Sequence, residues 1–136
     1  MEQLRDQYKI LEFRECGDER GNLVVAEGGE DIPFAIQRVF YIYGSDQEVV
    51  RGKHANRKTE FVLINVSGVS KVKVDNGFES NVILLDRPKI GLYLKNMLWK
   101  EMYDFSEDSV LLVLASEHYD EEEYIRNYNE FLNIIR

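Results

Sequence analysis

A single histidine among basic residues is the feature of this sequence with the clearest chemical potential. His54 lies between Arg51 and the pair Arg57-Lys58, in a chain whose formal net charge is −8. An imidazole titrates near neutral pH, so one side chain can both accept and release a proton. Arginine and lysine bind phosphate oxygens. The segment therefore predicts proton transfer on an anionic ligand, and the alternative is a structural histidine beside solvated surface charges.

The residues around this segment follow a β-strand pattern from about residue 8 to residue 116. Turn signals such as Asp75-Asn76-Gly77 separate the strands, and no helical segment lies between them. This spacing predicts a β-sandwich or barrel, whose interior is the usual place for a site. The expected strands are residues 8–12, 23–27, 38–43, 59–66, 69–74, 80–85, 90–94, 99–105 and 110–116.

One helix is expected, over about residues 120–135. Asp120 suits its N-cap, and Tyr124, Tyr128 and Leu132 would share one face. We expect this helix to pack on the outside of the barrel. The glutamates after Asp120 are interpreted as capping and solubilising residues rather than metal ligands.

The bulk composition limits the possible partners. A length of 136 residues predicts one domain, residues 1–136, and the negative charge argues against nucleic acid and anionic membranes as partners. The single cysteine, Cys16, cannot form an intrachain disulfide. The charged N-terminus argues against a signal peptide, and the lack of a long apolar run argues against a membrane span. We therefore expect a cytoplasmic protein.

The segment from Arg51 to Phe61 resembles the first metal-site motif of cupin barrels, a His-x-His pair followed by Glu or Gln. Here His54 occupies the first position, whereas Asn56 and Phe61 occupy the others, and the later histidine position falls on Lys100. One suitable ligand of four predicts no catalytic metal. No P-loop or dinucleotide fingerprint is present, so we expect no bound cofactor.

Collinear blocks over nearly the whole chain carry a closer resemblance. The chain is similar to the bacterial dTDP-4-keto-6-deoxyglucose 3,4-ketoisomerases, the WxcM-like group of the cupin superfamily. This resemblance implies an all-β cupin fold, a double-stranded β-helix or jelly roll, with a short C-terminal helix. The blocks are residues 18–23, 32–42, 51–55, 91–93, 99, 101–102, 104–106, 113–116, 119–121 and 124–126.

The resemblance also implies an activity and a partner. Members of the family are metal-independent homodimers that move the ketone of a dTDP-linked 6-deoxysugar from C4 to C3 through an enediol. They act on routes to surface glycans such as lipopolysaccharide O-antigen. The implied partner of this chain is therefore a dTDP-linked keto-deoxysugar.

The resemblance places the catalytic candidates at His54, Asn56 and Lys100. His54 alone keeps its family residue. One account is an enzyme whose base is His54, or Lys100 with a pKa lowered by burial, while Asn56 bonds a sugar oxygen. In this account Lys100 could instead stabilise the enediolate. The other account is a sugar-nucleotide-binding protein without catalysis.

The remaining candidates are substrate contacts. Arg20, Arg38, Arg51 and Lys58 match family positions and are expected at the diphosphate. The hydroxyls of Tyr41, Tyr93 and Tyr103 could reach the sugar, with core packing as the alternative for each.

Overall fold

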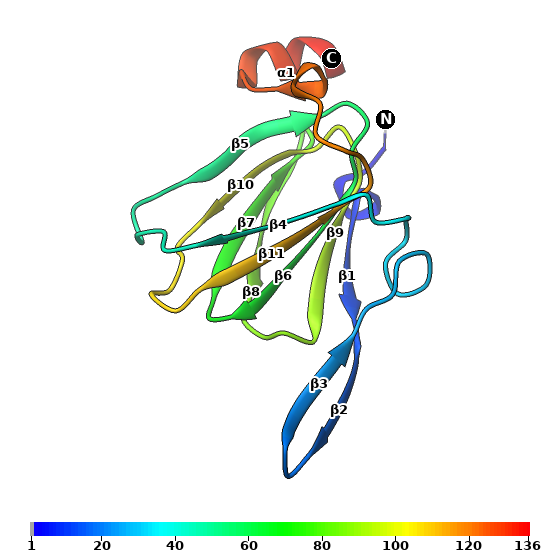
Figure 1. Ribbon diagram of the computed structural model, residues 1–136. Coiled ribbons are helices and arrows are strands. Elements are labelled where there is room, and N and C mark those ends of the chain that lie inside the picture. The colour runs from blue at the N-terminus through cyan, green and yellow to red at the C-terminus, as the bar shows by residue number, and fades with distance from the viewer. Residues whose placement is uncertain (1) are drawn as a thin grey trace.

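Residues 2–136 are described by a computed structural model, and they form two facing antiparallel five-stranded sheets (Figure 1). The first sheet has the order β1-β9-β6-β11-β4, and the second has the order β12-β5-β10-β7-β8. This confirms the predicted all-β barrel. The strands of the sheets are β1 (Tyr8–Glu12), β4 (Arg38–Tyr43), β5 (Arg51–Asn56), β6 (Phe61–Ser67), β7 (Ser70–Asp75), β8 (Ser80–Leu85), β9 (Ile90–Leu94), β10 (Trp99–Tyr103), β11 (Val110–Ala115) and β12 (Tyr124–Ile125).

The main core lies between the two sheets. Alternate residues of each strand point inward, so Phe61 and Leu63 of β6 meet Leu111 and Val113 of β11 and Met102 of β10 in one buried cluster. Apolar burial of this kind is the main stabilising contribution to such a barrel. The same side chains make the walls of the barrel interior apolar.

Both sheets are covered on their outer faces. Phe13 and Ile32, from the chain before β4, pack on Val62 and Leu114 of the first sheet. Helix α1 (Tyr128–Ile135) packs on the second sheet through Phe131, whose ring centroid lies 5.9 Å from that of Trp99. The helix is therefore outside the barrel, as predicted.

A two-stranded hairpin projects away from the barrel, at the opposite end of the molecule from α1 (Figure 1). It consists of β2 (Arg14–Asp18) and β3 (Gly21–Val25), joined by a turn at which Gly21 has a φ of +121°. All five residues of β2 are exposed. The sequence pattern did not indicate β2.

The C-terminal helix is half as long as predicted. It begins at Tyr128 with Asn127 as its N-cap, whereas Asp120 caps a short 3-10 turn, η2 (Glu121–Glu123). Tyr124 and Ile125 form β12 and pair with Asn56 and Ala55 of β5. Pairing with this sheet edge, together with burial of Ile125, outweighs the helical periodicity of the segment. A further 3-10 turn, η1 (Leu4–Asp6), precedes β1.

The strand β5 was also missed, although its residues were singled out for their chemistry. Its sequence, Arg-Gly-Lys-His-Ala-Asn, has none of the β-branched or aromatic residues that favour strands. It forms because β10 and β12 bond it from both sides. Within residues 2–136 no helix has the length and apolar character needed to cross a bilayer.

Candidate functional site

A cavity of about 90 Å³ lies inside the barrel, large enough for several water-sized groups. Its walls are mostly apolar, and three basic side chains reach it: Arg51 and His54 from β5, and Lys100 from β10. His54 therefore lies in the barrel interior. The complete lining is Phe40, Ile42, Arg51, Gly52, His54, Phe61, Leu63, Lys100, Met102 and Val113.

A β-bulge in β5 sets the positions of these groups. His54 pairs with Lys100, but the next pair along the ladder is Gly52 with Glu101, so Lys53 is an extra residue. Gly52 and Lys53 have φ values of +83° and +56°, in the left-handed region. Because residues directly opposite in a ladder point to the same face, His54 and Lys100 both project into the cavity.

His54 is held in its neutral form. Its pKa is lowered to about 3, first by burial and then by the positive charges of Lys100 and Arg126, while Asn56 and Glu123 act in the opposite direction. Its Nδ1 atom is buried and has no hydrogen-bond partner among residues 2–136. The ring packs edge-on against Tyr124, with centroids 4.9 Å apart. A neutral imidazole with an unpaired nitrogen is able to accept a proton.

Lys100 is a buried lysine with a lowered pKa. It is 3% exposed, and its Nζ atom lies 4.7 Å from the centroid of the Phe61 ring. Burial lowers its pKa to about 7, although the charge of Glu123 acts to raise it. Lys100 can therefore release or bind a proton near neutral pH.

Asn56 is buried between Lys100 and a carboxylate. Its Oδ1 atom accepts a hydrogen bond of 3.2 Å from Lys100 Nζ, and its Nδ2 atom donates one of 2.7 Å to Glu123 Oε1. The cavity lining does not include Asn56. The structure thus gives Asn56 a role beside Lys100, whereas its contact with the sugar stays a prediction.

Arg38 carries unused donors next to Tyr124, the residue whose ring packs against His54. It shares the inner face of β4 with Phe40, and its Nη1 atom donates to the Tyr124 hydroxyl at 3.1 Å. Its Nε and Nη2 atoms are buried and have no partner among residues 2–136. Buried donors normally find an acceptor, so these atoms are suited to an anionic ligand. The contact of Arg38 with the diphosphate stays a prediction.

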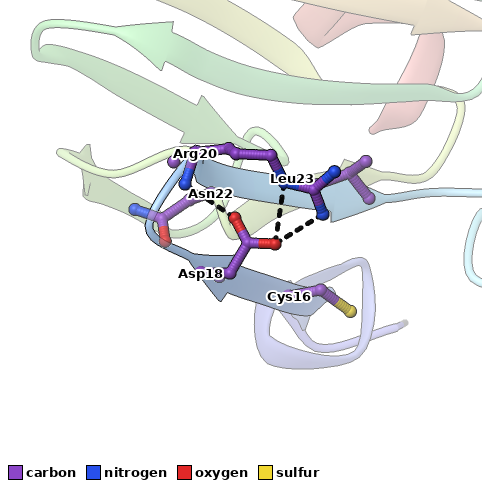
Figure 2. Close-up of a pocket in the computed structure, with 7 residues that line it drawn as sticks. Cys16, Asp18, Arg20, Asn22 and Leu23 are labelled. Carbon is purple, nitrogen blue, oxygen red and sulfur yellow. Dashed lines mark hydrogen bonds and ion pairs between the residues drawn. The ribbon is translucent and has the colours of Figure 1, made fainter.

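The other predicted cations lie farther from the cavity. Arg20 stands at the turn of the projecting hairpin and bonds Asp18, with an Nη2–Oδ2 distance of 2.6 Å (Figure 2). Lys58 is exposed, and its backbone N–H rather than its side chain bonds Glu123. The fold of one chain does not bring Arg20 to His54.

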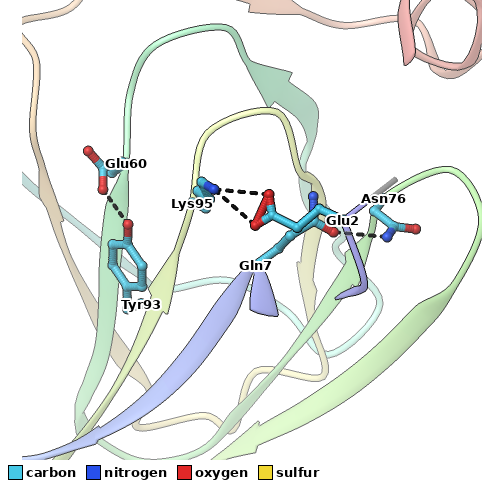
Figure 3. A network of polar contacts seen from close by, with 6 residues as sticks. All are labelled: Glu2, Gln7, Glu60, Asn76, Tyr93 and Lys95. Atoms are coloured by element: carbon cyan, nitrogen blue, oxygen red, sulfur yellow. Dashed lines mark hydrogen bonds and ion pairs between the residues drawn. The ribbon is translucent and has the colours of Figure 1, made fainter. Parts of the chain in front are cut away.

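The three predicted tyrosines face away from the cavity. Tyr41 is 61% exposed and stacks on Tyr43. Tyr93 donates a short hydrogen bond to Glu60 (Figure 3), and burial and Glu60 raise its pKa. Tyr103 alternates with the inward residues Lys100 and Met102 of β10, so it lies on the outer face. Strand alternation therefore places all three outside the cavity, and Tyr41 is a surface residue rather than the core residue of the alternative interpretation.

Glu123 is a residue near the site that the sequence interpretation missed. The pattern predicts an exposed glutamate at a helix start, but Glu123 is 3% exposed and lies beside Asn56. Tyr124 and Arg126, which follow it, contribute to the surroundings of His54. The apolar pair Tyr124-Ile125 after three glutamates was the only local signal of a strand here.

Residues 2–136 contain no cluster of three or more His, Cys, Asp or Glu side chains arranged for a metal ion. The absence of a catalytic metal stays a prediction. Of the four cupin ligand positions, one carries a histidine. Another carries Lys100, whose ammonium group has no lone pair to bind a metal ion.

Comparison with known proteins places this site in a family. The family model described as "FdtA: WxcM-like, C-terminal" matches residues 6–136. A TDP-4-oxo-6-deoxy-alpha-D-glucose-3,4-oxoisomerase from Aneurinibacillus thermoaerophilus is 45% identical over 127 residues, which are 93% of this chain and 91% of the relative.

Solved structures agree with this placement. A 3,4-ketoisomerase from Helicobacter canadensis superposes with a TM-score of 0.92 at 44% identity, covering 94% of this chain and 96% of its own. A mutant 3,4-ketoisomerase from Thermoanaerobacterium thermosaccharolyticum, in complex with TDP-4-keto-6-deoxyglucose, gives 0.93 at 41% identity, with coverage of 95% and 94%. The chain therefore belongs to the WxcM-like family of 3,4-ketoisomerases.

Proposed function

We propose that this protein is a dTDP-sugar 3,4-ketoisomerase that moves the ketone of a 4-keto-6-deoxyhexose from C4 to C3. The observation that carries the proposal is the pairing of His54 with Lys100 across β5 and β10, inside an apolar cavity. A double proton transfer needs two side chains that can each gain and lose a proton at an apolar cavity. The relatives that the chain resembles over more than nine-tenths of its length act on such a sugar.

The reaction needs two proton transfers on carbon and a redistribution on oxygen. His54 takes the proton from C3, and the electron pair of that C–H bond forms the C3–C4 double bond while the C4 carbonyl oxygen becomes an enediolate oxygen. Lys100, as the ammonium, stabilises this oxygen and provides a proton. The protonated His54 then gives its proton to C4, and the neutral Lys100 takes the proton from O3, which leaves the ketone at C3 and returns both side chains to their starting forms.

Substrate charge makes His54 a better base. The cations Lys100 and Arg126 contribute to the low pKa of His54 in the empty site. A bound diphosphate offsets these positive charges and raises the pKa of the imidazole. Arg38, with its two unpaired nitrogens, and Arg51 at the cavity are our choices for holding the diphosphate.

Proton exchange at C3 tests the activity directly. We expect incubation with dTDP-4-keto-6-deoxyglucose in deuterium oxide to give the 3-keto product with deuterium at C4, and exchange at C3 on reversal. His54→Asn should lower the rate by about 10²- to 10⁴-fold, because a general base contributes that much. His118→Asn is the matched control, since His118 is exposed and away from the cavity.

The opposite result would identify the alternative. Tight binding of the sugar nucleotide by the wild-type protein, with no deuterium at either carbon, would show a binding protein without catalysis. The metal-free expectation is tested on the same samples. Elemental analysis should find less than one transition-metal ion per chain, and dialysis against a chelator should leave the rate unchanged.

We also propose a cytoplasmic homodimer that serves surface-glycan synthesis, including lipopolysaccharide O-antigen. Family resemblance supports the dimer, and so does the exposed row of Val39, Tyr41 and Tyr43 on the edge strand β4. The hairpin projects away from its own barrel, so in a dimer we expect Arg20 to contribute to the site of the second chain. Sedimentation equilibrium should give twice the mass of one chain.

A further inference from the structure

Glu123 is a buried carboxylate that the mechanism above does not use. It enters the barrel wall from η2, outside the sequence block that carries His54. Burying a carboxylate is costly unless donors surround it. Here Asn56 Nδ2 donates at 2.7 Å, the backbone N–H groups of Lys58 and Thr59 donate at 2.8 Å and 3.1 Å, and the Thr59 hydroxyl adds a short bond.

These donors keep Glu123 ionised. Burial raises its pKa, but the hydrogen bonds from Thr59, Lys58 and Asn56 outweigh burial, so the pKa lies below its usual value. A negative charge is therefore fixed beside Asn56 at every pH at which the enzyme would work. Three of its four donors come from the turn after β5 rather than from Asn56.

Asn56 transmits this charge to Lys100. A carboxylate can only accept a hydrogen bond and an ammonium can only donate one, so the amide has one permitted orientation between them. Its Nδ2 faces Glu123, and its Oδ1 faces Lys100 Nζ at 3.2 Å. Asn56 is 1% exposed, so solvent does not compete for either end.

Among residues 2–136, Asn56 Oδ1 is the one hydrogen-bond acceptor of Lys100 Nζ. Its other close neighbour is the face of Phe61, and apart from Arg51 and His54 the cavity walls are apolar. The ionisable groups that face it are His54 and Arg51 from β5 and Glu123 from η2, while Arg126 acts on His54. Among these, Glu123 alone carries a negative charge.

We propose that Glu123 is a positioning residue which, through Asn56, aims Lys100 Nζ into the sugar cavity and favours its ammonium form. The proposal rests on the proposed function in one respect, that Lys100 acts on the enediolate. It assigns a task to Asn56, which replaces a family histidine: the amide joins a fixed carboxylate to a catalytic lysine.

Glu123→Gln tests the link without changing the shape of the side chain. The variant loses the charge and presents an N–H group to the Asn56 amide, which must then turn its oxygen away from Lys100. The protein is labelled with ¹³C at lysine Cε, and the Lys100 signal is assigned by its loss in Lys100→Arg. We expect the titration midpoint of Lys100 to move to lower pH in Glu123→Gln.

Two further variants bracket this result. Glu122→Gln, one residue earlier and exposed, is the matched control and should leave the midpoint unchanged. Asn56→Leu removes the link but leaves Glu123 its other three donors, so the wall can still fold, and it should also lower the midpoint. If Lys100 titrates at the wild-type pH in both Glu123→Gln and Asn56→Leu, the proposal is overturned.

Kinetics provide an independent readout. We expect kcat of Glu123→Gln to fall about tenfold, a part of what a general acid contributes, with KM within about twofold because Glu123 does not touch the substrate. The limb of the kcat–pH profile that belongs to Lys100 should move to lower pH. A uniform loss of kcat at every pH, with an unmoved limb, would mean a merely structural role.

The two proposals can fail separately. A wild-type protein that exchanges no deuterium, but whose Lys100 midpoint moves in Glu123→Gln, overturns the isomerase and supports the link. An active wild-type enzyme whose Lys100 midpoint is the same in both variants supports the isomerase and overturns the link.

Discussion

At the scale of single residues, burial rather than residue type alone determines the pKa values of His54 and Lys100. The pKa of His54 is lowered to about 3 and that of Lys100 to about 7, and burial is the leading cause for both. A lysine, which is charged in neutral water, and a histidine, which is partly charged there, therefore coexist in one mostly apolar cavity. The fold tolerates them because both can become neutral.

This arrangement predicts how stability changes with pH. Lys100 has a pKa of about 7 in the folded protein, against 10.5 for a lysine side chain in water. Between these values the unfolded chain binds a proton that the folded chain does not, so stability rises with pH. Below about pH 7 both states are protonated, and the cost of the buried ammonium is present in full.

Replacing Lys100 by an apolar residue should therefore increase the free energy of unfolding most at acidic pH. We expect Lys100→Met to gain stability relative to the wild type, because the variant has no ammonium to bury. This gain should be about 2–3 kcal/mol larger at pH 6 than at pH 9. Urea unfolding at the two pH values measures the difference. Lys9→Met, at an exposed position of β1, should show the same difference at both. An equal effect of Lys100→Met at pH 6 and pH 9 would contradict the buried-ammonium account.

At the scale of elements, the bulge in β5 is the feature that places the site. Gly52 adopts a φ of +83°, and a Cβ added there would lie 2.9 Å from the Lys100 carbonyl oxygen and 3.1 Å from Met102 Sδ. The strand can thus approach β10 closely only with glycine at this position. Lys100 is on the strand that such a Cβ would displace.

Gly52→Ala should therefore damage both stability and the site. Left-handed backbone costs an L-residue about 1–2 kcal/mol, and the contact with Lys100 adds to that cost. Gly44→Ala is the matched control, because Gly44 has a φ of +70° with nothing within 4 Å of the added Cβ. Urea unfolding should show a greater loss for Gly52→Ala, and its rate of isomerisation should fall while that of Gly44→Ala is kept. Equal losses of stability in the two variants would remove the role of close approach.

At the scale of the whole molecule, the hairpin is the element that one chain does not explain. Arg20 lies at its turn, and the hairpin leaves the barrel at the end opposite to α1 (Figure 1). An exposed two-stranded ribbon is marginally stable by itself. Its place on a second chain would account both for its extension and for the predicted contact of Arg20 with the diphosphate.

Mixing two inactive variants tests this arrangement. Arg20→Ala and His54→Asn should each be inactive alone as dimers. In a mixed dimer, one site regains both residues if the hairpin serves the neighbouring chain. Refolding an equal mixture should therefore recover about a quarter of the wild-type rate, because half of the dimers are mixed and each has one intact site. No recovery, with Arg20→Ala inactive, would place Arg20 in the site of its own chain.

The sequence by itself determined the family, the location of His54 in the barrel and the strand pattern apart from β2, β5 and β12. Turns such as Asp75-Asn76-Gly77 and alternating strands are local signals, so they can be identified without the fold. Collinear blocks identify the family over the whole chain. Lys100 was found in the same way, from its place after Trp99.

The tertiary structure alone decided which candidates meet. Alternation along a strand separates two faces but does not say which one is inside, so Tyr41, Tyr93 and Tyr103 were assigned to the pocket and lie outside it. Glu123 reaches Asn56 across 67 positions of sequence, through the pairing of β12 with β5. A helical periodicity in that segment gave no sign of this pairing, because long-range burial and hydrogen bonding overrode the local preference.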